Sequence, residues 1–203
     1  MNDRLRRLAP PPVRLPRRAD EQVSRFDRAV DEWFEEHLRG HAVADAVFYA
    51  ASALGDHGAL WIAAAAAQAG RRHLAGAPPP AWRPALLRAV AGLGVESALV
   101  NGPVKWVFRR ERPVHEGTRP LHLRQPRTSS FPSGHATAAF FGAALLREDD
   151  PLWPLYYGLA VVVAASRVHV RIHHASDVVG GVVVGVALGE LARRLVRVGE
   201  PDR

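Results

Sequence analysis

Apolar residues gather in six segments that are separated by polar, proline-containing or charged stretches. None of the segments shows the alternation of apolar and polar residues that a half-buried strand requires. The pattern therefore predicts an all-α protein, a helical bundle of about six helices. The segments cover residues 42–54, 58–75, 85–104, 134–146, 152–168 and 178–196.

The same segments raise the question of a membrane. A helix needs about 20 residues to cross a bilayer core of about 30 Å, and about 17 are tolerated. The first and fourth segments fall short, and the mean hydropathy of −0.09 is low for a polytopic membrane protein. A soluble, alanine-rich bundle is therefore an alternative.

Two features favour the membrane. Segment 152–166 carries no charge and has its aromatic residues at one end, as at a lipid interface. Gly181, Gly185 and Gly189 form a ridge of small residues that allows close approach of another helix. We therefore expect mostly transmembrane helices.

The N-terminal part of the chain has a different pattern. Residues 1–20 are rich in proline and arginine and lack an apolar run, which predicts a disordered basic arm. From Glu21 to Arg39, apolar residues recur at helical spacing between charged ones. This predicts an amphipathic helix that lies in the membrane interface or packs on the domain. We expect a single domain over 21–199, with a long polar loop at 109–132.

Charge and composition narrow the function only partly. The chain has 27 Lys and Arg against 20 Asp and Glu, a net charge of +7. This balance suits nucleic acid, an anionic membrane or a phosphorylated substrate. The charge is spread over the chain without a helix-turn-helix or aromatic-interleaved basic patch, which argues against nucleic acid. The absence of cysteine excludes thiol nucleophiles and zinc ribbons.

Residues suited to phosphate chemistry occur in three clusters. Phosphoryl transfer needs fixed donors around the phosphate oxygens, and the clusters supply three cations and a turn that opens into a helix. His173 and Asp177 are four residues apart, so on a helix the carboxylate can bond the imidazole and leave its other nitrogen free. The clusters are Lys105-x6-Arg112-Pro113, Pro132-Ser133-Gly134-His135 and Ser166-Arg167-x5-His173-x3-Asp177.

In this order the clusters resemble the signature blocks of the type 2 phosphatidic acid phosphatase superfamily, which includes lipid phosphate phosphatases, bacterial acid phosphatases and vanadium haloperoxidases. The resemblance covers about residues 42–196, with the blocks within 105–177. It implies that His173 forms a phosphohistidine, that Asp177 orients it, and that His135 protonates the leaving oxygen and later activates water. It also implies phosphate binding without a metal or other cofactor, by Lys105, Arg112, Ser133, Gly134 and Arg167.

The resemblance leads to an expected function. The chain is expected to be a phosphatase of the cell membrane that acts on a lipid or polyprenyl phosphate monoester, or on a diphosphate. With a cytoplasmic N-terminus and six spanning helices, the three clusters meet on the extracytoplasmic face. The alternative is a soluble acid phosphatase or vanadate-dependent haloperoxidase with the same pocket. His115 and His122 could touch substrate, whereas His169 could line the pocket or serve packing.

Overall fold

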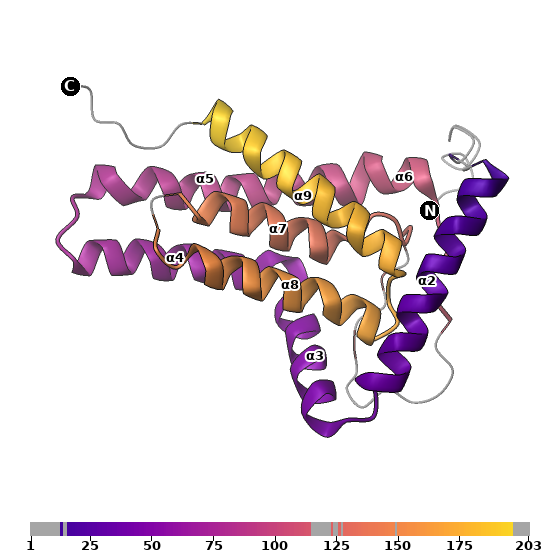
Figure 1. The fold of residues 1–203 in the computed structure, drawn as a ribbon. Helices are drawn as coiled ribbons and strands as arrows, with labels where there is room; N and C mark the ends of the chain where they lie inside the picture. Colours follow the sequence, from indigo (N-terminus) through magenta and orange to yellow (C-terminus); the bar gives the residue numbers. More distant parts are fainter. Residues whose placement is uncertain are drawn as a thin grey trace.

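The computed structural model describes residues 13, 16–114, 123, 126, 128–148 and 150–196, and the described residues contain helices and no strand (Figure 1). This confirms the predicted all-α fold. Most of the expected basic arm, together with His115, His122 and residues 197–199, lies outside the described residues. The elements are α2 (Arg17–His37), α3 (Ala42–Leu54), η1 (Asp56–Gly58), α4 (Ala59–Leu74), α5 (Pro79–Leu99), η2 (Val100–Val104), α6 (Lys105–Phe108), α7 (Gly134–Leu146), α8 (Trp153–His169) and α9 (Ala175–Leu195).

The amphipathic helix α2 starts earlier than the sequence pattern indicates. Its first residue is Arg17 rather than Glu21, so the last residues of the predicted arm are helical. Pro16 precedes the helix, and Asp20 lies in its first turn, where the carboxylate interacts favourably with the positive end of the helix dipole. Phe34 and Asp27 are its buried side chains.

The central helix of the bundle is α7, which is buried along most of its length and packs chiefly against α8 and α9 (Figure 1). The predicted glycine ridge lies on α9 against α7. A Cβ atom added at Gly185 would come within 2.4 Å of the Thr137 carbonyl oxygen, and one at Gly181 within 2.6 Å of the Ser133 carbonyl oxygen. The ridge therefore lets the two backbones approach closely and brings the N-termini of α7 and α9 together.

A kink separates α5 from α6. Gly102, in η2, has φ −95° and ψ −105°, and Pro103 follows it. A glycine outside helical geometry followed by a proline that lacks an N–H breaks the hydrogen-bond ladder of a helix. The kink makes Lys105 the first residue of a new short helix at one end of the bundle.

Helix α3 has a different direction from the other apolar helices. It projects at a steep angle from the bundle (Figure 1), and ion pairs near its start and beyond its end join it to one end of the bundle. Near its start, Asp45 Oδ1 lies 2.7 Å from His169 Nε2 on α8. Beyond its end, Asp56 Oδ1 lies 3.1 Å from His135 Nε2 on α7. The segment therefore lies across this end of the bundle and does not run along it.

Among the described helices, α9 is the one that is both long and apolar enough to cross a membrane. Helices α3 and α7 are apolar but shorter.

Candidate active site

The three sequence clusters meet at one end of the bundle. The start of α6, the N-terminus of α7 and the turn between α8 and α9 surround a cavity of about 310 Å³. Lys105, Gly134, His135 and His173 line it, together with Asp56 and further residues of α5, η2 and the polar loop. The cavity therefore brings both predicted catalytic histidines to one space.

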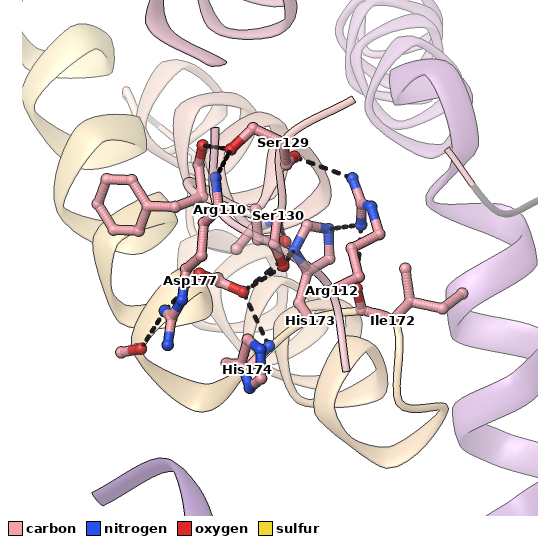
Figure 2. Close-up of polar contacts among 12 residues, drawn as sticks. Arg110, Arg112, Ser129, Ser130, Ile172, His173, His174 and Asp177 are labelled. Carbon is pink, nitrogen blue, oxygen red and sulfur yellow. Dashed lines mark hydrogen bonds and ion pairs between the residues drawn. The ribbon is translucent and has the colours of Figure 1, made fainter. Parts of the chain in front are cut away.

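His173 is 2% exposed, and its two ring nitrogens have different partners (Figure 2). Nε2 lies 3.1 Å from Arg112 Nη1. Because a guanidinium can only donate, this contact requires an unprotonated Nε2 and places the ring proton on Nδ1. Burial lowers the pKa of His173 to about 3, with Arg112 and Arg167 acting in the same direction and Asp177 opposing them. The imidazole is therefore neutral at ordinary pH, and the electron pair on its Nε2 accepts from Arg112.

Asp177 is fully buried and its carboxylate accepts three hydrogen bonds (Figure 2). They come from Arg110 Nη1 at 2.7 Å, from Ser130 Oγ at 2.5 Å and from the backbone N–H of His174 at 2.9 Å. The direct hydrogen bond expected from the four-residue spacing is not made, because His173 Nδ1 is 3.7 Å from Asp177 Oδ2.

The hydroxyl of Ser130 lies between these two side chains. It donates to Asp177 and stands 3.4 Å from His173 Nδ1. Asp177 thus acts on His173 through its charge and through Ser130, a residue that sequence reasoning missed although it lies three residues before Ser133.

His135 is held from α3 and η1. Its Nε2 lies 3.2 Å from the Ser52 carbonyl oxygen and 3.1 Å from Asp56 Oδ1. Both of these atoms are acceptors, so Nε2 carries a hydrogen and Nδ1 is the nitrogen left for a substrate. No spacing in the sequence indicated Ser52 or Asp56, because their elements, α3 and η1, are distant along the chain from the three clusters.

Of the three predicted phosphate-binding cations, Lys105 lines the cavity, whereas Arg112 and Arg167 are not among the described residues that line it. Each of the three is held by other groups. Lys105 is 5% exposed, and its Nζ donates to Asn101 Oδ1 at 2.9 Å. Arg112 donates to the carbonyl oxygens of Thr128, Ser129 and Ile172 as well as to His173. Arg167 is 2% exposed and donates to the Ser52 hydroxyl. Positive charge gathered in a buried place favours an anion there.

Ser133 and Gly134, at the turn into α7, were both predicted to bind phosphate, but only Gly134 lines the cavity. Ser133 is fully buried as the N-cap residue, and its hydroxyl accepts from the N–H of Ala136 at 3.4 Å instead of facing the cavity. A Cβ atom added at Gly134 would lie 3.1 Å from Asn101 Oδ1, which is a tight contact, and 3.5 Å from Lys105 Nζ, which is an ordinary one. The glycine therefore gives room to the Asn101 amide that accepts from Lys105.

Arg110 is the second missed residue that contacts Asp177. Besides Asp177, its guanidinium donates to Asp27 Oδ2 on α2 at 2.6 Å and to Ser176 Oγ at 2.6 Å. Asp27 also accepts from the N–H and hydroxyl of Ser176 at 2.8 and 2.9 Å. Helix α2 is thereby bound to the first turn of α9, which carries Asp177. His169, by contrast, pairs with Asp45 and packs on Phe48, with ring centroids 4.7 Å apart.

Comparison with known protein families shows which family has this sequence. A family model described as the PAP2 superfamily matches residues 85–198, which include all three clusters. The chain belongs to the PAP2 superfamily. The structural comparison agrees, because the fold is similar to that of a transmembrane PAP2 type phosphatidylglycerolphosphate phosphatase from Bacillus subtilis. The TM-score is 0.66 at 22% identity, over 90% of each chain.

Curated relatives of this PAP2 chain are named as phosphatases of polyprenyl compounds. Decaprenylphosphoryl-5-phosphoribose phosphatase of Mycolicibacterium smegmatis is 38% identical over 134 residues, which is 65% of this chain and 68% of that protein. Undecaprenyl-diphosphatase of Sulfolobus acidocaldarius is 38% identical over 93 residues, 43% of this chain and 45% of that protein.

Proposed function

We propose that the chain is a metal-independent membrane phosphatase that hydrolyses a lipid or polyprenyl phosphate through a phosphohistidine at His173. The observation that carries this proposal is the unprotonated Nε2 of His173, which accepts from Arg112 at a cavity that His135 and Lys105 also line. Membership of the PAP2 superfamily and the names of the relatives support the reaction class.

The reaction takes two steps in this geometry. Nε2 of His173 attacks phosphorus and the bond from phosphorus to the leaving oxygen breaks. His135, which enters this step as the imidazolium with Nε2–H held by Ser52 and Asp56, gives its Nδ1 proton to that oxygen. His135 then takes a proton from water, whose oxygen attacks phosphorus and breaks the phosphorus–nitrogen bond, which releases phosphate and restores His173. The charge on the equatorial oxygens is stabilised by the cations Lys105, Arg112 and Arg167. Gly134 has no side chain and leaves space in the cavity for these oxygens.

An apolar groove supports a lipid substrate. It lies between α5 and α9, has a volume of about 620 Å³ and is lined by residues such as Leu87, Leu99 and Leu188. Glu96 lines both this groove and the catalytic cavity, so the two spaces meet there. A hydrocarbon chain in the groove would leave its phosphate within reach of the cavity.

The protein is proposed to be a multi-pass protein of the cell membrane with its active site on the extracytoplasmic face. Because α3 lies across the active-site end, the spanning set becomes α4, α5, α7, α8 and α9. Helix α2 then lies on the side of the active site, which differs from the expected cytoplasmic N-terminus. Arg71, Arg72, Arg193 and Arg194 near the opposite helix ends agree with the positive-inside tendency.

Two experiments test this proposal. Purified protein in detergent should release phosphate from lipid and polyprenyl phosphates in excess chelator and lose this activity in His173→Ala. Activity that chelator abolishes and a divalent ion restores would contradict metal independence. Vanadate-dependent oxidation of halide without phosphatase activity would favour the haloperoxidase alternative.

The second experiment uses the absence of native cysteine, which lets a single introduced thiol report the topology. Val114→Cys near the active site should react with a membrane-impermeant thiol reagent on intact cells, and Leu74→Cys at the other end should not. Both side chains are more than four-fifths exposed. Labelling of Leu74→Cys alone would place the site in the cytoplasm.

A further inference from the structure

A buried carboxylate stands beside the catalytic cavity without a role in the proposed mechanism. Glu96 on α5 is 3% exposed, and its Oε1 has no hydrogen-bond partner among the described residues. An ionised oxygen that is removed from water and left unpaired is unfavourable, so a donor that reaches it is strongly preferred there. The charge of Lys105, whose Nζ donates to Asn101, favours the ionised form of Glu96 without a hydrogen bond to Oε1.

The position of Glu96 identifies which part of a substrate would meet it. It lines the cavity with His135 and His173, and it lines the apolar groove with Leu99 and Leu188. A lipid with its phosphate at His173 and its chain in the groove therefore places at Glu96 the group that joins the two. In a diphosphate that group is a second phosphate, and in a polyol or sugar phosphate it carries hydroxyls.

We propose that Glu96 forms a subsite that accepts a hydrogen bond from a hydroxyl next to the transferred phosphoryl group and disfavours a second phosphate at that place. The proposal rests on the proposed function and narrows its substrate class to phosphate monoesters of hydroxyl-bearing lipids. Hydroxyl donation satisfies Oε1, whereas a second phosphate meets a like charge in a buried place.

Two pairs of substrates measure the two parts of the proposal. The first pair is 1-oleoylglycerol 3-phosphate and its 2-deoxy analogue, which differ by one hydroxyl. The wild type should have a kcat/KM about tenfold higher for the hydroxyl-bearing lipid, the size expected for one hydrogen bond to a charged group. In Glu96→Ala this ratio should fall close to one.

The second pair is farnesyl phosphate and farnesyl diphosphate. The wild type should favour the monophosphate, and Glu96→Gln, which keeps the size of the side chain but removes the charge, should raise the relative kcat/KM for the diphosphate about tenfold. Glu190→Gln is the matched control, because Glu190 pairs with Arg147 and Arg193 away from the cavity. It should leave both ratios unchanged.

Other outcomes overturn the subsite. Unchanged kcat/KM ratios for both substrate pairs in the Glu96 variants would do so. An equal loss of kcat/KM on all four substrates would do so as well, because it is expected if Glu96 has a structural or proton-donating role. Binding of the two oleoyl lipids to the wild type in detergent micelles separates this result from failure of the proposed function. Hydroxyl-dependent binding without phosphate release would refute the phosphatase proposal alone, and equal binding would refute the subsite.

Discussion

Asp27 on the amphipathic helix α2 is predicted to support catalysis although it does not line the catalytic cavity. Its carboxylate binds Arg110, whose guanidinium also binds the catalytic candidate Asp177. Asp27→Asn keeps the size of the side chain and removes the charge that faces Arg110. Arg110 then keeps Asp177 as its charged partner together with Ser176, its contact with residue 27 becomes that of a neutral amide, and the first turn of α9 loses part of its support.

The magnitude follows from the burial of this pair. The side chain of Asp27 is 7% exposed and that of Arg110 is 28% exposed, so solvent screens the pair only in part. A hydrogen bond to a charged group is worth about 1.5–3 kcal/mol, and partial exposure puts the expected loss near the lower end. If this loss raises the activation free energy of the reaction by about 1.4 kcal/mol, kcat falls about tenfold. KM should change less than twofold, because the phosphate-binding cations are untouched.

The assay is steady-state phosphate release in detergent, combined with a double-mutant cycle. If Asp27 acts through Arg110, the variant Asp27→Asn/Arg110→Gln should have the same kcat as Arg110→Gln alone. Asp31→Asn is the matched control on α2, because Asp31 pairs with Arg39 and Arg171 instead. Independent, multiplying effects of Asp27→Asn and Arg110→Gln would refute the reasoning. So would a loss of thermal stability with an unchanged kcat.

Further predictions concern the histidines and the packing of α9. His135→Ala should slow release from alkyl phosphates by about 10²–10⁴-fold and affect p-nitrophenyl phosphate less, since that leaving group departs unprotonated; equal losses would exclude His135 as the acid. Because the pKa of His173 is about 3 in the fold against about 6.5 when unfolded, the unfolded chain binds the proton more readily below pH 6.5. Thermal stability should therefore fall as pH drops from 6.5 to 4, and less so in His173→Gln. Gly185→Ala should destabilise the protein by about 1–3 kcal/mol in thermal unfolding, whereas Gly94→Ala, where a Cβ meets nothing within 4 Å, should not.

The elements that depend on local pattern could be predicted from the sequence. Helices α3 and α7 have the predicted bounds, because each is a mostly apolar segment flanked by polar residues or glycine. The residues that line the cavity were also predictable where a motif carries them, as for Lys105, Gly134, His135 and His173. In these cases spacing along the chain determines which side chains share a helix end.

Contacts between distant segments could not be predicted in this way. The support for His135 comes from Ser52 and Asp56, and that for Asp177 from Asp27 and Arg110. Nothing in the apolar pattern of 42–54 gives its direction relative to the bundle, and an arginine in an arginine-rich loop carries no signal of its own. The direct bond between His173 and Asp177 was a geometric inference from helical spacing. It is not made, because His173 precedes the first residue of α9 and is not part of that helix.

In the proposed mechanism, the contact between Arg112 and His173 makes phosphate binding precede the attack by Nε2. Arg112 Nη1 shares its hydrogens between the Ile172 carbonyl oxygen and the electron pair of His173 Nε2. A phosphate dianion is a stronger acceptor than a neutral imidazole, so its arrival draws the guanidinium from Nε2 to a phosphate oxygen. The remaining bonds of Arg112 to Thr128 and Ser129 keep it in place during this change. On the proposed mechanism, the electron pair of His173 Nε2 is then released when the phosphoryl group that it attacks is bound.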